Sequence, residues 1–120
     1  MDKMVLRGME YYGYHGVFAE ERKLGQRYIV DLALEMDLGA AGSSDDLTTT
    51  VNYAEVHELV QGIVQHKSFK LIEALAEHIA SSVLDTYTMV DALTVCVTKP
   101  HPPFDVHFEG VTVELYRSRK

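Results

Sequence analysis

Hydrophobic residues occupy every second position between residues 28 and 38, and most positions between them are polar or small. A period of two is typical of a strand with one buried face, so we predict a long half-buried strand here. Residues 4–14 predict an earlier strand, in which Gly8 and Gly13 interrupt the alternation. Residues 16–25 have glycine at both ends and a charged middle, which indicates the long, ordered loop of a hairpin.

Helical spacing replaces this alternation in the middle of the chain. Residues 39–50 are small and polar and predict a loop. Asn52 followed three residues later by Glu55 resembles a capping box, and the apolar positions after it predict a first helix. A second helix is predicted over about residues 70–86. The two apolar stripes are Val56, Leu59, Val60, Ile63 and Val64, then Leu71, Ile72, Leu75, Ala76, Ile79 and Val83.

Alternation returns at residues 93–98 and 111–116, which predict two more strands. Pro100, Pro102 and Pro103 lie in the loop between them and cannot donate to a β ladder. The predicted order is therefore β-β-α-α-β-β. We expect the α+β class, with a four-stranded antiparallel sheet, both helices on one face, and residues 1–120 in a single domain.

Composition narrows the possible partners and the location. The formal charge is −7, from 11 basic and 18 acidic residues, which argues against nucleic acid or an anionic membrane as a partner. A monomer of this size buries only about two-thirds of its unfolded surface, so a site shared between subunits is favoured over a deep private pocket. A lone Cys96, no apolar signal-peptide region near Met1, and no apolar stretch of about 20 residues favour the cytoplasm.

Motifs for metals and nucleophiles are missing from the sequence. No two of the six histidines form a compact ligand spacing such as His-x-His or His-Glu-x-x-His, so we expect no metal site. His101 and His107 bracket a loop, but a third ligand is not evident. The chain also lacks a glycine-rich phosphate loop and a Gly-x-Ser-x-Gly motif.

Two charged residues are candidates for chemistry. Lys99 continues the phase of Val95 and Val97, so it points to the apolar face at the end of its strand. A buried lysine loses hydration, which favours its neutral form and suits proton transfer; alternatively, the side chain reaches back to water. Glu73 lies in the first turn of the second helix and could accept two parallel N–H bonds from a flat heterocycle. The alternative is a solvated glutamate that only suits the helix dipole.

Three further residues have weaker support. Tyr53, next to the N-cap, could stack on a flat ligand or transfer a proton, or it could simply pack against the helix. Glu21 in the charged loop reads on its own as a solvated charge. His15 is better explained as a turn residue with a hydrogen-bonded ring than as a catalyst.

Several motifs together resemble dihydroneopterin aldolases, from about residue 5 to residue 116. Each motif is weak alone, but their order and spacing are specific. They are Gly8-Met9, Tyr12-Gly13-Tyr14-His15-Gly16, Glu21, Gly25-Gln26, Ala40-Ala41, Asp45-Asp46-Leu47, Thr50-Val51-Asn52-Tyr53-Ala54-Glu55-Val56, Leu71-Ile72-Glu73-Ala74-Leu75-Ala76, Thr98-Lys99, Pro102-Pro103 and Gly110-Val111.

This resemblance implies the tunnelling fold, whose element order agrees with the predicted one. It also implies tetrameric β-barrel rings, two of which stack into a homo-octamer with active sites between adjacent subunits. The implied reaction is retro-aldol cleavage of 7,8-dihydroneopterin in folate biosynthesis, which yields 6-hydroxymethyl-7,8-dihydropterin and glycolaldehyde. No cofactor is expected, and epimerisation at C2′ is the expected side activity.

The resemblance also implies roles for single residues. Glu73 would anchor the pterin through the exocyclic amine and the neighbouring ring N–H, and the backbones of Ile72 and Val51 would add polar contacts. Tyr53 would stack on the ring from the neighbouring subunit. Lys99, Tyr53 and Glu21 would transfer protons.

Three alternatives stay open at this point. A dihydroneopterin triphosphate epimerase would need a basic cluster for its phosphates, and the loops at residues 20–23 and 39–50 look too acidic or neutral. A zinc-dependent pyruvoyl-tetrahydropterin synthase would need three histidines on the barrel wall. A non-catalytic pterin- or purine-binding module would need only Glu73.

Overall fold

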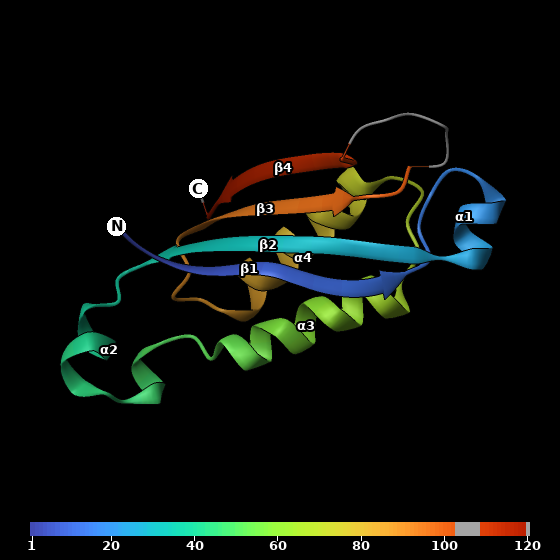
Figure 1. Ribbon diagram of the computed structural model, residues 1–120. Coiled ribbons are helices and arrows are strands. Elements are labelled where there is room, and N and C mark those ends of the chain that lie inside the picture. The colour runs from blue at the N-terminus through green and yellow to red at the C-terminus, as the bar shows by residue number, and fades with distance from the viewer. Residues whose placement is uncertain (103–108, 120) are drawn as a thin grey trace.

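A computed structural model describes residues 1–102 and 109–119 of the chain; Pro103 and Phe104 of the predicted proline loop, and His107, lie outside the described residues. Four strands form one antiparallel sheet in the order β1-β2-β3-β4 (Figure 1). The strands are β1 (Asp2–Gly13), β2 (Gln26–Met36), β3 (Ala92–Lys99) and β4 (Val111–Ser118).

Two long helices, α3 (Tyr53–His66) and α4 (Ile72–Thr86), cover one face of this sheet (Figure 1). The predicted fold class, element order and placement of the helices are therefore confirmed. Asn52 is the N-cap of α3, and its Oδ1 accepts the N–H of Ala54 at 3.0 Å. No helix in the described part of the chain has the length and apolar character to cross a membrane.

The core lies between the sheet and the helices. All five residues on one face of β2, from Tyr28 to Met36, are buried, as the alternation predicts. Val30 pairs with Val97 on β3, and Leu34 pairs with Leu93, so the apolar phases of neighbouring strands coincide. The same phase places Lys99, the last residue of β3, on the helix-covered side of the sheet.

Two predicted loops contain short helices that were not predicted, although β1 and β2 do form the predicted hairpin. The loop at residues 16–25 contains α1 (Ala19–Leu24), and the loop at residues 39–50 contains α2 (Gly39–Ser44) and the 3₁₀ helix η1 (Leu47–Thr49). Segments of three to six residues are too short to show a helical period. A local side-chain hydrogen bond stabilises η1, because Asp46 is its N-cap and accepts the N–H of Thr48.

Gly8 explains the weaker alternation of β1. The register against β2 shifts between Leu6 and Met9, and Gly8 has a φ of 64°, which favours glycine. Its N–H donates to Oδ1 of Asp31 on β2 at 2.6 Å. This bulge moves the side chains that follow it to the opposite phase, so a strict two-residue period is lost within one continuous strand.

Candidate active site

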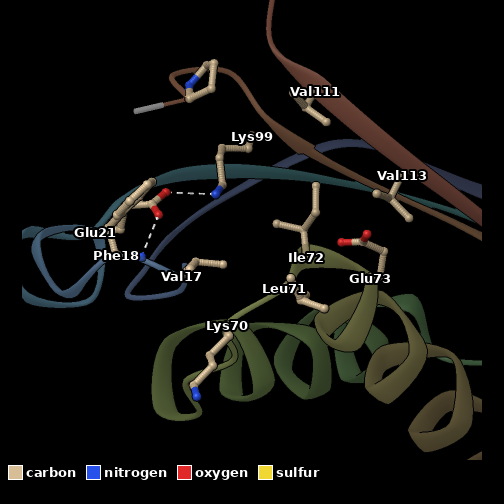
Figure 2. A pocket seen from close by; sticks show the side chains of 11 residues that line it. Val17, Phe18, Glu21, Lys70, Leu71, Ile72, Glu73, Lys99, Val111 and Val113 are labelled. Carbon is tan, nitrogen blue, oxygen red and sulfur yellow. Dashed lines mark hydrogen bonds and ion pairs between the residues drawn. The ribbon is translucent and has the colours of Figure 1, made fainter. Parts of the chain in front are cut away.

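A cavity of about 250 Å³ opens where the end of β3, the start of α4 and the loop around α1 meet (Figure 2). Its walls are mostly apolar, and four of its residues are the predicted Glu21, Ile72, Glu73 and Lys99. The lining residues are Val17, Phe18, Glu21, Lys70, Leu71, Ile72, Glu73, Lys99, Pro102, Val111 and Val113.

Lys99 and Glu21 form an ion pair inside this cavity. The Nζ of Lys99 donates to Oε2 of Glu21 at 2.9 Å, and the two side chains are 13% and 6% exposed. Lys99 therefore does not reach back to water, and Glu21 is not the solvated charge that its loop position alone suggested. A pair so well shielded interacts more strongly than a surface salt bridge.

The turn before α1 holds the Glu21 carboxylate in place. Oε1 of Glu21 accepts the N–H of Phe18 at 3.3 Å, and the N–H of Glu21 donates to the carbonyl of Phe18 at 3.1 Å. Gly16 leaves the necessary room, because a Cβ at this position would lie 2.5 Å from the Glu21 carboxyl carbon. One carboxylate oxygen of Glu21 thus accepts a backbone N–H, and the other accepts the Lys99 ammonium group.

Glu73 and Ile72 form the first turn of α4 at the other side of the cavity. Ile72 is buried, Glu73 is exposed, and in Figure 2 Ile72 lies between Glu73 and Lys99. The first N–H groups of a helix have no partner within the helix, and Leu71 at the N-cap has no side-chain acceptor to offer them. This end of α4 therefore presents N–H donors, a positive helix dipole and a carboxylate together.

Tyr53 and Val51 lie elsewhere in the chain. Tyr53 is 65% exposed at the start of α3, Val51 is buried just before it, and neither lines the cavity. In Figure 1, α3 begins beside η1, at the end of the molecule away from α1. One chain thus brings together Glu21, Ile72, Glu73 and Lys99 but leaves the two other predicted contacts apart.

Several lining residues were not predicted as site residues. Val17 and Phe18 precede α1, Lys70 precedes α4, and Val111 and Val113 lie on β4. No local sequence pattern marks these residues as part of a site, because their segments come together only in the folded chain. Exposed Lys70 adds a second cation near the rim, and its ammonium group points away from Lys99 (Figure 2).

His15 is fully buried and does not line the cavity. Its Nε2 lies 2.8 Å from the carbonyl oxygen of Val64, and the N–H of Phe69 donates to its Nδ1 at 3.0 Å. Burial lowers the pKa of His15, and the positive charge of Lys99 lowers it further. The predicted structural role, with a hydrogen-bonded ring, agrees with this geometry. Tyr28 stands edge-on to the ring, and burial together with the Glu21 charge raises the pKa of Tyr28 to about 12.

Within the described residues, no group of three His, Cys, Asp or Glu side chains could hold a metal ion. Cys96 lies on the opposite face of the sheet, where its Sγ contacts Oε1 of Glu114 at 3.5 Å. Burial and this carboxylate raise the pKa of the Cys96 thiol to about 11, which disfavours the reactive thiolate.

Comparison with known proteins places this geometry in a family. The model of the family described as dihydroneopterin aldolase matches residues 4–116. The dihydroneopterin aldolase of Bacillus subtilis is 50% identical over 119 residues, which cover 99% of each chain. The chain belongs to the dihydroneopterin aldolase family.

Solved structures agree with this assignment. The E. coli dihydroneopterin aldolase, crystallised with neopterin, superposes with a TM-score of 0.91 at 24% identity and covers 98% of this chain and 100% of its own, which shows the shared fold. A dihydroneopterin aldolase from Burkholderia thailendensis bound to guanine gives a TM-score of 0.80 at 26% identity, with 99% and 92% covered. The resemblance inferred from the sequence motifs is thus confirmed for the family and for the fold of its subunit.

Proposed function

We propose that this dihydroneopterin aldolase cleaves its substrate by moving protons alone, without a metal ion and without a Schiff base. The observation that carries the proposal is that the buried Lys99–Glu21 pair and the carboxylate of Glu73 line a single cavity. One side of the cavity would hold the pterin ring and the other would handle protons. The whole chain, residues 1–120, would act as one domain in the cytoplasm.

Glu73 would anchor the pterin. Two carboxylate oxygens can accept two parallel N–H bonds from the exocyclic amine and the adjacent ring N–H, a bidentate arrangement with charge-assisted strength. The backbone at Ile72 would add a polar contact at the start of α4. Guanine, which the Burkholderia relative binds, has the same amine and ring N–H edge as a pterin. The apolar walls around Leu71 and Val113 suit the faces of a flat heterocycle.

The substrate itself would supply the electron sink. Dihydroneopterin has a ring C=N bond next to the side chain. Loss of the proton from the 2′-hydroxyl breaks the C1′–C2′ bond, releases glycolaldehyde, and sends the bonding electrons into that C=N to give an enol-like intermediate. Protonation of C1′ then completes 6-hydroxymethyl-7,8-dihydropterin. Positioning can supply about 7–11 kcal/mol of a barrier, and acid–base catalysis about 10²–10⁴-fold in rate.

Three side chains would divide the proton transfers. Lys99 would act through a water molecule near the ring nitrogen and the hydroxyl of the departing fragment. Glu21 would orient the Lys99 ammonium group or that water. Tyr53 would protonate the enol-like intermediate. If the released aldehyde rotates and adds back through its other face before this protonation, the product is the C2′ epimer. We therefore propose epimerisation as a side activity.

Tyr53 and the backbone of Val51 would reach the cavity from a neighbouring subunit. Strands β1 and β4 are the two edges of the sheet, and pairing them between subunits would close a tetrameric barrel and remove the exposed edges. Two such rings would stack into the homo-octamer. Tyr53 is exposed and does not line its own chain's cavity, and α3, which begins with Tyr53, starts at the end of the molecule away from α1 (Figure 1), which supports this arrangement.

The test is incubation of the chelator-treated protein with 7,8-dihydroneopterin, followed by detection of glycolaldehyde. We expect the rate to be unchanged by the chelator. We also expect no inactivation when sodium borohydride is added during turnover, since there would be no imine between a lysine and the substrate to reduce. A rate that falls on chelation and returns with added zinc, or a protein trapped by borohydride, would refute the proposal.

A further inference from the structure

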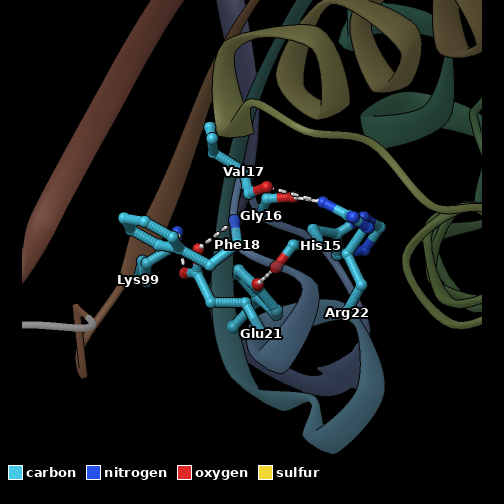
Figure 3. A network of polar contacts seen from close by, with 8 residues as sticks. His15, Gly16, Val17, Phe18, Glu21, Arg22 and Lys99 are labelled. Carbon is cyan, nitrogen blue, oxygen red and sulfur yellow. Dashed lines mark hydrogen bonds and ion pairs between the residues drawn. The ribbon is translucent and has the colours of Figure 1, made fainter.

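The cavity has two sides, which are the start of α4 with Glu73 and the ion pair of Lys99 and Glu21. Glu73 and Ile72 follow the link between α3 and α4, whereas Glu21 follows the turn after β1. These segments are about 50 residues apart in the chain, so the distance between the two sides depends on how the link and the turn are joined. The joining contacts lie around His15, and Figure 3 shows the part of them that runs from the turn to Glu21 and Lys99.

Phe69 in the link is held from both of its backbone groups. Its N–H donates to Nδ1 of His15 at 3.0 Å, and its carbonyl accepts the N–H of Gly16 at 2.8 Å. The Phe69 and His15 rings stack, with centroids 5.8 Å apart and an angle of 18° between the planes. Because the N–H of Phe69 can only donate, Nδ1 must be the acceptor, and Nε2 carries the proton that is donated to Val64. His15 thus uses one ring nitrogen to hold the link and the other to hold the last turns of α3.

A second set of contacts connects the turn after β1 to Glu21. Arg22 donates from Nη1 to the carbonyls of Gly16 at 2.9 Å and Val17 at 2.7 Å, which fixes the turn (Figure 3). The N–H of Phe18, the next residue, donates to the Glu21 carboxylate. A chain of contacts therefore runs from the start of α4, through the ring of His15, to the ion pair.

We propose that His15 is a positioning residue, whose bond to Phe69 keeps Glu73 in register with the Lys99–Glu21 pair. His15 does not line the cavity and would not contact substrate. This inference rests on the proposed function in assigning Glu73 to the pterin and Lys99 to the protons. Without the bond the pterin would still bind to Glu73, but its side chain would sit out of reach of Lys99.

Two conservative variants separate this role from mere support of the fold. In His15→Asn the amide oxygen can occupy the place of Nδ1 and still accept the N–H of Phe69, while the bond to Val64 is lost. In His15→Gln the longer amide can still donate to Val64, while the bond to Phe69 is lost. Each variant loses one buried hydrogen bond, so each serves as the other's control for stability.

The measurement is the rate of glycolaldehyde release per pterin-binding site, with sites counted by titration with 6-hydroxymethylpterin. We expect His15→Gln to lose at least about tenfold in this rate while its Kd for the pterin changes by less than about threefold, and His15→Asn to stay within about threefold of the unaltered protein in both. Equal rates per site in the two variants would overturn the inference.

Hydrogen exchange at the amides of Phe69 and Leu75, whose N–H groups donate to His15 and to the Leu71 carbonyl, keeps this test separate from the proposed function. The exchange should be faster in His15→Gln than in His15→Asn, whether or not the protein turns over substrate. If the unaltered protein releases no glycolaldehyde but the exchange differs as expected, the proposed function fails and the link between His15 and α4 stands. If release is normal and the two variants exchange alike, the positioning role fails alone.

Discussion

Lys99 and Glu21 are 78 positions apart in the chain, yet the Lys99 ammonium nitrogen lies 2.9 Å from the Glu21 carboxylate. Their segments enter the cavity from different parts of the fold, since one ends β3 and the other belongs to α1. Neither residue stands out in its own segment. Their pairing places two charged groups in a mostly apolar cavity that Glu73, at the start of α4, also lines.

The Glu73 carboxylate should contribute to binding and hardly at all to stability. Replacement by alanine would remove the two charge-assisted hydrogen bonds proposed between Glu73 and the pterin, so we expect the Kd for 6-hydroxymethylpterin to rise about 100-fold. Because Glu73 is exposed, the free energy of unfolding should change by less than about 0.5 kcal/mol. The control is Glu58→Ala, an exposed glutamate of α3, which should leave the Kd unchanged. Tight binding by Glu73→Ala would disprove the anchoring role.

Tyr53 should act across a subunit boundary. Tyr53→Ala and Lys99→Ala proteins should each be nearly inactive, but unfolding and refolding them together should create some sites with both native residues. Random mixing in a closed ring gives about a quarter of such sites, and we expect about that fraction of the original activity. Mixing Glu73→Ala with Lys99→Ala is the control, because both residues line the cavity of the same chain and mixing cannot restore a site with both. Equal activity in the two mixtures would mean that Tyr53 does not complete a neighbour's site.

How far the sequence could predict this site depends on the type of signal at each residue. The apolar phase of β3 correctly placed Lys99 on the helix side, and helical spacing placed Glu73 in the first turn of α4. Glu21 could be selected only through the family resemblance, because burial of a loop carboxylate depends on a turn that closes against distant Lys99. Val17, Phe18 and Val111 have no local signal at all, since their common cavity exists only after β4 and α1 meet α4.

Gly16 should be needed for the position of the Glu21 carboxylate. It has a φ of 141°, and a Cβ there would lie 2.5 Å from the carboxyl carbon. We expect Gly16→Ala to destabilise the fold by about 1–3 kcal/mol and to lower the rate of glycolaldehyde release about tenfold or more. Gly62→Ala in α3 is the matched control, because a Cβ there has no atom within 4 Å. It should stabilise the protein by about 0.5–1 kcal/mol with unchanged activity, as measured by urea unfolding and turnover.

Burial of neutral His15 predicts a loss of stability in acid. Its pKa in the folded chain lies below the ordinary 6.5, so between the two values the unfolded chain binds more protons and the free energy of unfolding falls as pH falls. The charge of Lys99 opposes protonation of the ring, and Tyr28, whose ring stands edge-on to it, is another titratable neighbour. Urea unfolding at roughly pH 7.5 and pH 5.5 should show a smaller loss in His15→Asn than in the unaltered protein. An equal loss in both would show that another group causes the acid sensitivity.

The most direct test of the site is glycolaldehyde release by Lys99→Ala, measured with chelator present and at saturating 7,8-dihydroneopterin. The account predicts that release falls at least about 10²-fold, the contribution of a positioned acid–base group, while 6-hydroxymethylpterin binds with nearly unchanged Kd. Release at the rate of the unaltered protein would contradict the role of Lys99 and, with it, the proton-transfer side of the site.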